Sequence, residues 1–219
     1  MLQRERVCQI IAWTTSLTVS ATAIIVWGSY YDWHVWPINS YELFPVFGLL
    51  AFSLMWAHYV CGALRELMGL DKAVLKRYFD ITSWAVLVLI CLHPGLLIYQ
   101  RFRDGYGLPP RSYMSYVAPG LGWVTLLGSA SWLVFIAFEF RRKFGRRSWW
   151  HYVANAGDAA MLAILYHGLR LGTQLMNGWF RYVWLFYFLT LSAVLIRKYV
   201  KRYRGHRPPG GPAHQKSPA

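Results

Sequence analysis

The sequence predicts an all-α membrane protein, a bundle of six transmembrane helices. Of its 219 residues, 56% are hydrophobic and only 15% are charged, a balance typical of membrane proteins. Apolar stretches of about 18 residues or more recur along the chain, and each is long enough for a helix across a hydrocarbon core of about 30 Å. We expect spans at residues 8–28, 43–64, 81–100, 116–138, 155–173 and 180–196.

The basic residues predict the orientation of these spans. Most of the 23 Lys and Arg residues lie at the N-terminus, in loops 65–80 and 139–151, and after residue 196. Because cytoplasmic loops are rich in Lys and Arg, both termini are expected in the cytoplasm. We therefore predict a multi-pass protein of the cell inner (plasma) membrane, in contact with lipid. The same asymmetry accounts for the net charge of +14 without nucleic acid as a partner.

The chain divides into a membrane domain, residues 1–204, and a short tail. Residues 205–219 are rich in Pro and Gly and lack apolar periodicity, so we expect a disordered cytoplasmic tail. After the last span we expect no flavin or nicotinamide domain, and no G-x-G-x-x-G motif follows a strand pattern. The chain is therefore not expected to take hydride from NAD(P)H by itself.

Two histidines lie near the ends of two apolar stretches, His93 in AVLVLICLHPGLLIY and His167 in AAMLAILYHGLRLG. With a cytoplasmic N-terminus, the third and fifth spans both run outward, which places both imidazoles roughly 10 Å below the outer ends of the helices. At the same level, they could hold one haem iron from opposite sides, with Gly95 and Gly168 giving the macrocycle room. The alternative is a pair of histidines that only form hydrogen bonds between helices.

The residues around these histidines resemble a known family. The run FGLLAFSLMWAHYVCGALRELMGLDKAVLKRYFDITSWAVLVLICLHP is similar to the second and third spans of the ferric reductase-like transmembrane domain, with its short GLD loop and its His-Pro. The run RRKFGRRSWWHYVANAGDAAMLAILYHGLRLG is similar to the basic loop and the His-Gly ending of the family's fifth helix. The family includes ferric reductases, the membrane part of superoxide-producing NADPH oxidases and the haem-bearing membrane subunit of the bacterial methionine sulfoxide reductase system.

What this resemblance implies is a membrane cytochrome b, an electron transport protein whose haem b iron is bound by His93 and His167. Family members with two haems carry a second histidine 13 or 14 residues before each ligand. In this sequence the corresponding positions hold Phe79 or Asp80 and Val153 or Ala154. One haem is therefore expected, and a second would require an unconventional inner ligand, for which His58 is the candidate.

Electron transfer through this chain would require other components. The donor would be a separate flavoprotein reductase, a bound flavin such as FMN or a membrane quinol at the cytoplasmic half. The acceptor would be an extracytoplasmic protein, a ferric chelate or oxygen, and the chain would be the haem-carrying component of a transmembrane oxidoreductase. Arg101 and Arg170 lie at the outer level and could bind the haem propionates. Contact with lipid headgroups is the alternative for both.

His58 in the second span and Asp158 in the fifth are expected at similar depth in the inner half of the bundle. An intramembrane carboxylate is by default a candidate functional group, so the pair could pass protons or bind a quinone head group. A structural hydrogen bond that neutralises both groups is the alternative. The competing hypothesis for the whole chain is a haem-free membrane module that uses this pair for proton or solute passage, or in which the histidines only pack.

Overall fold

The structure is a computed structural model of the chain and describes residues 2–34, 39–144, 150–176 and 178–205. Within these ranges the chain is mainly helical and contains no strand, which confirms the predicted all-α class. The predicted disordered tail, residues 205–219, lies outside the described residues apart from Gly205. The elements are α1 (Leu2–Tyr30), α2 (Ser40–Leu67), η1 (Lys72–Leu75), α3 (Lys76–Arg103), α4 (Arg111–Met114), α5 (Gly122–Phe144), α6 (Trp150–Leu171), α7 (Thr173–Met176) and α8 (Phe180–Gly205).

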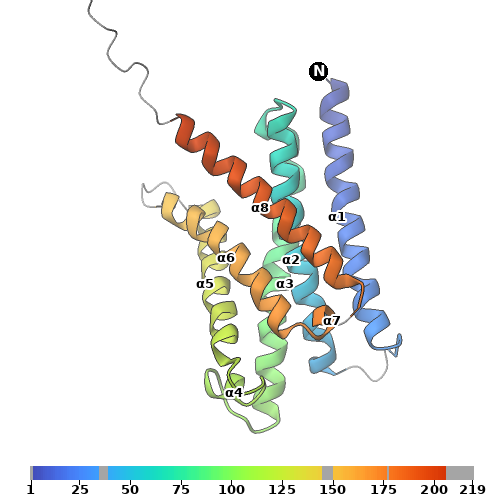
Figure 1. The fold of residues 1–219 in the computed structure, drawn as a ribbon, viewed down its shortest axis with the longest axis vertical. Coiled ribbons are helices and arrows are strands. Elements are labelled where there is room, and N and C mark those ends of the chain that lie inside the picture. The colour runs from blue at the N-terminus through green and yellow to red at the C-terminus, as the bar shows by residue number, and fades with distance from the viewer. Residues whose placement is uncertain (1, 35–38, 145–149, 177, 206–219) are drawn as a thin grey trace, which may run out of the picture.

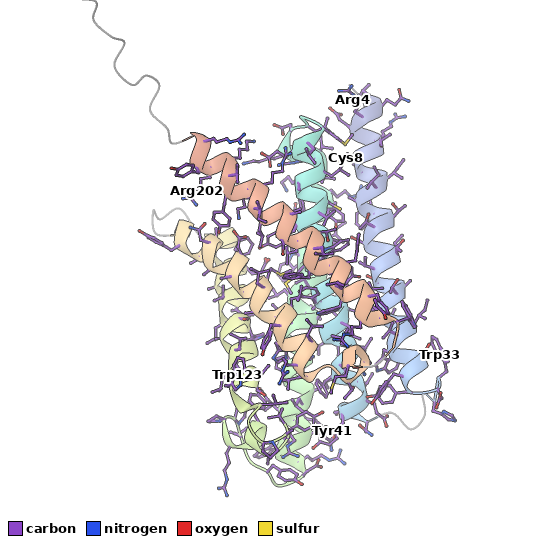
Figure 2. The ribbon with its side chains drawn as sticks, viewed as in Figure 1. Arg4, Cys8, Trp33, Tyr41, Trp123 and Arg202 are labelled. Atoms are coloured by element: carbon purple, nitrogen blue, oxygen red, sulfur yellow. The ribbon has the colours of Figure 1, made fainter. Side chains whose placement is uncertain are left out.

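The long helices run up and down a single bundle (Figure 1). The start of α1, the η1 turn and the end of α8 lie at one end, which we call the basic end because Arg4 and Arg202 are there (Figure 2). Trp33, Tyr41 and Trp123 lie toward the opposite end (Figure 2). Helices α3 and α6 both run away from the basic end, in the same direction, as the sequence predicts.

Five helices of the described chain are long and apolar enough to cross a membrane, which marks a multi-pass membrane protein: α1, α2, α3 with η1, α5 and α8. The predicted fifth span, α6, is not among them. Its 22 residues have sufficient length, but Asn155, Asp158 and His167 lower its mean hydropathy. Because α6 packs along α5 and also contacts α8, its polar side chains can be satisfied by protein rather than lipid.

Local sequence signals explain where α2 begins and ends. Asn39 Oδ1 accepts a hydrogen bond from the backbone N–H of Glu42 at 3.1 Å, and the Glu42 carboxylate accepts one from the backbone N–H of Asn39 at 3.2 Å. At the other end Gly69 adopts φ +67°, a conformation that glycine adopts readily. Asp71 Oδ1 then accepts from the backbone N–H of Ala73 at 2.7 Å and starts η1. The GLD segment is therefore a compact helix-to-helix turn.

The bundle is built from two helical hairpins and two further helices. Helix α2 packs on α3, α5 packs on α6, α1 lies against α2, and α8 contacts both α2 and α6. Aromatic rings fill the contact between α2 and α8, where Phe52 lies 4.4 Å from Trp184 and Trp56 lies 4.4 Å from Tyr187, centroid to centroid. This arrangement leaves α3 and α6 each attached mainly to its own hairpin partner.

Candidate functional site

His93 is held against the preceding helix, α2. Its Nδ1 lies 2.7 Å from the backbone carbonyl oxygen of Phe44, and its ring centroid lies 5.4 Å from that of the Phe44 side chain. The Nδ1 and Cε1 atoms are turned toward Gly48, where an added Cβ would come within 2.7 Å of both. Since a carbonyl oxygen can only accept, Nδ1 carries the proton in this bond. The Nε2 atom is therefore left with its lone pair.

His167 is held in the same way in the second hairpin. Its Nδ1 lies 2.9 Å from the backbone carbonyl oxygen of Val124 on α5, so Nδ1–H is again the donor. Its Nδ1 and Cε1 atoms face Gly128, where an added Cβ would come within 2.6 Å of both. In each hairpin the accepting carbonyl belongs to the residue four positions before the glycine. Two separate hairpins thus present an imidazole with the same nitrogen anchored.

The two imidazoles come from different hairpins, on helices that run in the same direction. They are carried by α3 and α6, and within the described part of the chain these two helices do not pack closely on one another. No group of three or more His, Cys, Asp or Glu residues in the described ranges could bind a metal ion. A haem iron can take two ligands from the protein, so two imidazoles with Nδ1 bonded and a lone pair left on Nε2 could supply them.

The glycines beside the two histidines have different surroundings. A Cβ at Gly95 would meet no atom within 4 Å, and Gly95 is exposed on α3, so its role beside a macrocycle stays a prediction. At Gly168 a Cβ would come within 2.9 Å of the Trp184 ring. The space beside Gly168 is therefore occupied by α8, and the sequence-based interpretation of this glycine is wrong.

Arg101, at the end of α3, is only 6% exposed. Its guanidinium lies 3.4 Å from the Tyr106 ring centroid, and Nη2 donates to Ser115 Oγ. Its Nε atom is buried and has no hydrogen-bond partner among the described residues. A buried cationic donor with an unused N–H is suited to an anionic oxygen such as a haem propionate. Arg170, the other predicted propionate ligand, is exposed at the end of α6.

Asp158 is buried, 4% exposed, and its carboxylate oxygens are bonded within the protein. Tyr59 donates to Oδ1 at 2.9 Å, while Lys198 at 2.5 Å and Tyr199 at 2.8 Å donate to Oδ2. These bonds tie α6 to α2 and α8. The predicted pair with His58 is wrong, because the hydrogen bonds of Asp158 in the described chain come from these three residues.

His58 lies on the other side of α2, against α3. Its Nε2 and Thr82 Oγ1 are 2.6 Å apart, and its ring packs edge-on against Phe79 with centroids 5.3 Å apart. Neighbouring residues on a helix point about 100° apart, so Tyr59, not His58, faces Asp158. Phe79, one of the two positions of the third span at which the predicted resemblance would place an inner ligand, packs beside His58.

Sequence reasoning identified the two histidines and missed the glycines and carbonyls that hold them. Gly48 and Gly128 lie within long apolar segments, where a glycine in a helix interior costs stability relative to alanine. Such an isolated glycine, when it lies at the same depth as a candidate ligand on the neighbouring span, could have pointed to these contacts in the sequence. The carbonyl acceptors leave no such signal, because every residue type has one.

The fold and the paired histidines define the class, an all-helical multi-pass membrane protein with two equivalently anchored imidazoles. Comparison of the chain with family models, curated proteins and solved structures gives no match. Membership of the ferric reductase-like family therefore stays a prediction from the residues quoted above.

Proposed function

We propose that this chain is a membrane b-type cytochrome in which one haem b binds between His93 and His167 and carries electrons across the bilayer. The observation that supports it best is the matched anchoring of the two imidazoles. In both hairpins Nδ1 is bonded to a backbone carbonyl, at 2.7 and 2.9 Å, which leaves Nε2 to bind a metal. Metal-binding histidines commonly have the second ring nitrogen fixed in this way.

The proposal assigns a role to each group of the site. His93 and His167 would bind the iron, and Arg101, with its unused Nε, would bind a propionate. Arg170 would bind the other propionate from the exposed end of α6. Haem supplies one-electron transfer at a potential that its ligands and surroundings adjust. The protein would contribute two imidazoles whose orientation is fixed by the bonds of Nδ1 to backbone carbonyls.

The contacts of His58 support one haem rather than two. An inner haem bound by His58 would need a free ring nitrogen directed at the metal, but Nε2 is 2.6 Å from Thr82 Oγ1. Phe79 packs against the same ring at 5.3 Å and would have to move. Breaking a buried hydrogen bond and displacing an aromatic ring both cost stability.

The proposal includes six spans with both termini in the cytoplasm of the plasma membrane, so that the basic end faces the cytoplasm. A flavoprotein reductase, FMN or a quinol would supply electrons there, and an acceptor outside the cell membrane would receive them. His93 and His167 belong to the second halves of α3 and α6, two helices that run away from the basic end. Under this proposal the haem would lie nearer to the acceptor than to the donor.

The visible spectrum of the purified protein tests the proposal. We expect a dithionite-reduced b-type spectrum with about one haem per chain, which is lost in His93→Ala and in His167→Ala. His58→Ala is the matched control, since it removes a histidine of the same bundle and should keep the spectrum. A colourless wild-type protein, expressed with a haem precursor in the medium, would instead support the haem-free membrane module.

A further inference from the structure

We propose that Gly48 and Gly128 are positioning residues that fix which nitrogen of His93 and His167 is offered to a metal, and in which ring orientation. The proposal deepens the cytochrome function and rests on it for its haem readout. Its central claim, the tautomer of each imidazole, concerns the protein alone. Neither glycine contacts the other, so the two hairpins provide independent tests.

The first step in the argument is the identity of the contacts in the two hairpins. At Gly48 the three nearest atoms to an added Cβ are Cε1, Nδ1 and Cγ of His93, at 2.7, 2.7 and 3.3 Å. At Gly128 they are the same three atoms of His167, at 2.6, 2.6 and 3.3 Å. The two hairpins are far apart in the sequence, yet each places the same edge of its imidazole ring against a glycine. A chance packing contact would not require the same ring edge twice.

The second step is why a glycine is required. A Cβ closer than 3.0 Å to a ring atom forces something to move, and the imidazole is the group in its way. The ring would swing off the helix surface, which lengthens or breaks the bond from Nδ1 to Phe44 O or Val124 O. Without that bond the proton can sit on either nitrogen, because isolated neutral imidazole has both tautomers available. The glycine therefore keeps the proton on Nδ1 of the histidine that packs against it.

The third step separates positioning from helix packing. A glycine that only lets two backbones approach would affect stability when replaced, but not the protonation of a distant ring nitrogen. The chain offers matched controls of this kind. A Cβ at Gly62 on α2 would be 3.9 Å from Phe79, and a Cβ at Gly157 on α6 would be 3.8 Å from Phe138, both ordinary contacts. Neither position faces a histidine ligand.

The experiment measures the tautomers of haem-free protein by NMR with ¹⁵N-labelled histidine. We expect the Nδ1–H form for both ligands in the wild type. In Gly48→Ala His93 alone should become a mixture of tautomers, and in Gly128→Ala His167 alone should do so. Gly62→Ala and Gly157→Ala should keep the wild-type pattern. Loss of a group that orients a metal-binding histidine typically lowers metal affinity 10- to 100-fold, so haem affinity should fall by that factor in the two test variants.

Each outcome decides a separate question. Wild-type rings in the Nε2–H form would overturn the inference whether or not the variants fold. Folded Gly48→Ala and Gly128→Ala proteins with unchanged tautomers and unchanged electron paramagnetic resonance of the ferric haem would overturn it as well. A colourless wild-type protein with Nδ1–H at both rings would defeat the cytochrome function and leave the positioning role standing.

Discussion

His167 and Asp158 lie nine residues apart on α6 and differ in how completely the protein hydrogen-bonds their polar atoms. Both carboxylate oxygens of Asp158 accept hydrogen bonds from the protein, three in all, from α2 and α8. His167 has one ring nitrogen bonded to a backbone carbonyl of α5. The carboxylate is thus satisfied internally, whereas the imidazole is fixed at one nitrogen and can still bind a ligand through the other.

This difference separates a polar group of α6 that is satisfied within the fold from one that, under the proposed function, would bind a ligand. A buried charge that the protein neutralises completely has little capacity left for an incoming ligand, and removing it leaves its partners unsatisfied. A polar group that is fixed through one atom and unbonded at another can still bind a ligand. Burial and polarity alone, which are all that the sequence offers, do not separate the two cases.

The largest expected effect that tests this comparison is the loss of stability in Asp158→Ala. Removal of the carboxylate leaves Tyr59 and Tyr199 without their acceptor and Lys198 without its counter-ion. Lys198 is about half exposed, so we expect a loss of about 2–3 kcal/mol, below the range for fully buried pairs. The free energy of unfolding in detergent measures it, and the haem spectrum at low temperature should be unchanged.

Asp158→Asn is the matched control, since it removes the charge and one acceptor oxygen but keeps the other oxygen as an acceptor for the donors that face it. Its loss of stability should be smaller than that of Asp158→Ala. If Asp158→Ala instead keeps its stability and abolishes electron uptake from a quinol or a flavin reductant, Asp158 belongs to the chemistry and the comparison fails.

An intermediate effect is expected at Arg101, whose Nε is buried and has no hydrogen-bond partner in the described chain. Arg101→Gln removes the positive charge and the proposed propionate contact. Hydrogen bonds to charged groups are worth about 1.5–3 kcal/mol, so haem dissociation to apomyoglobin should be at least about tenfold faster. Arg170→Gln, at an exposed position, should have a smaller effect. Equal dissociation rates in both variants and the wild type would contradict the propionate role of Arg101.

The smallest effect is expected at Asp104, an exposed carboxylate with the same kind of tyrosine donor as Asp158. The Tyr41 hydroxyl donates to it at 2.5 Å and, with Gln100 and nearby arginines, holds the pKa of Asp104 below its ordinary value. Since the folded-state pKa is lowered, its contribution to stability is present above the ordinary pKa of 3.8 and is lost as the pH falls through the lowered pKa.

The denaturation midpoints of wild type and Asp104→Asn as a function of pH measure this contribution. We expect a small difference at pH 7 that disappears in strong acid. A difference as large as that of Asp158→Ala would show that exposure does not separate the two carboxylates.

The helices, their class and the shared direction of α3 and α6 could be predicted from the sequence, because apolar length and the Lys and Arg distribution act locally. The helix bounds in the structure differ from the predicted bounds of the spans mainly because helices continue beyond the apolar stretches, as α1 and α8 do. The partner of Asp158 could not be predicted, since choosing Tyr59 over His58 requires the rotation of α2 about its axis. The carbonyl oxygens that hold His93 and His167 belong to residues more than 40 positions away along the chain. No local sequence pattern reveals such contacts.

The two acceptors that hold the ligand histidines, Phe44 O and Val124 O, are main-chain atoms. Substitution of the residue that carries such an oxygen does not delete it, whereas a side-chain acceptor can be lost through one codon change. The faces of α2 and α5 beneath the imidazoles can therefore vary in sequence as long as the helix persists and the two glycines remain. In a library of variants, we expect Phe44 and Val124 to accept other apolar side chains far more readily than Gly48 and Gly128 accept any.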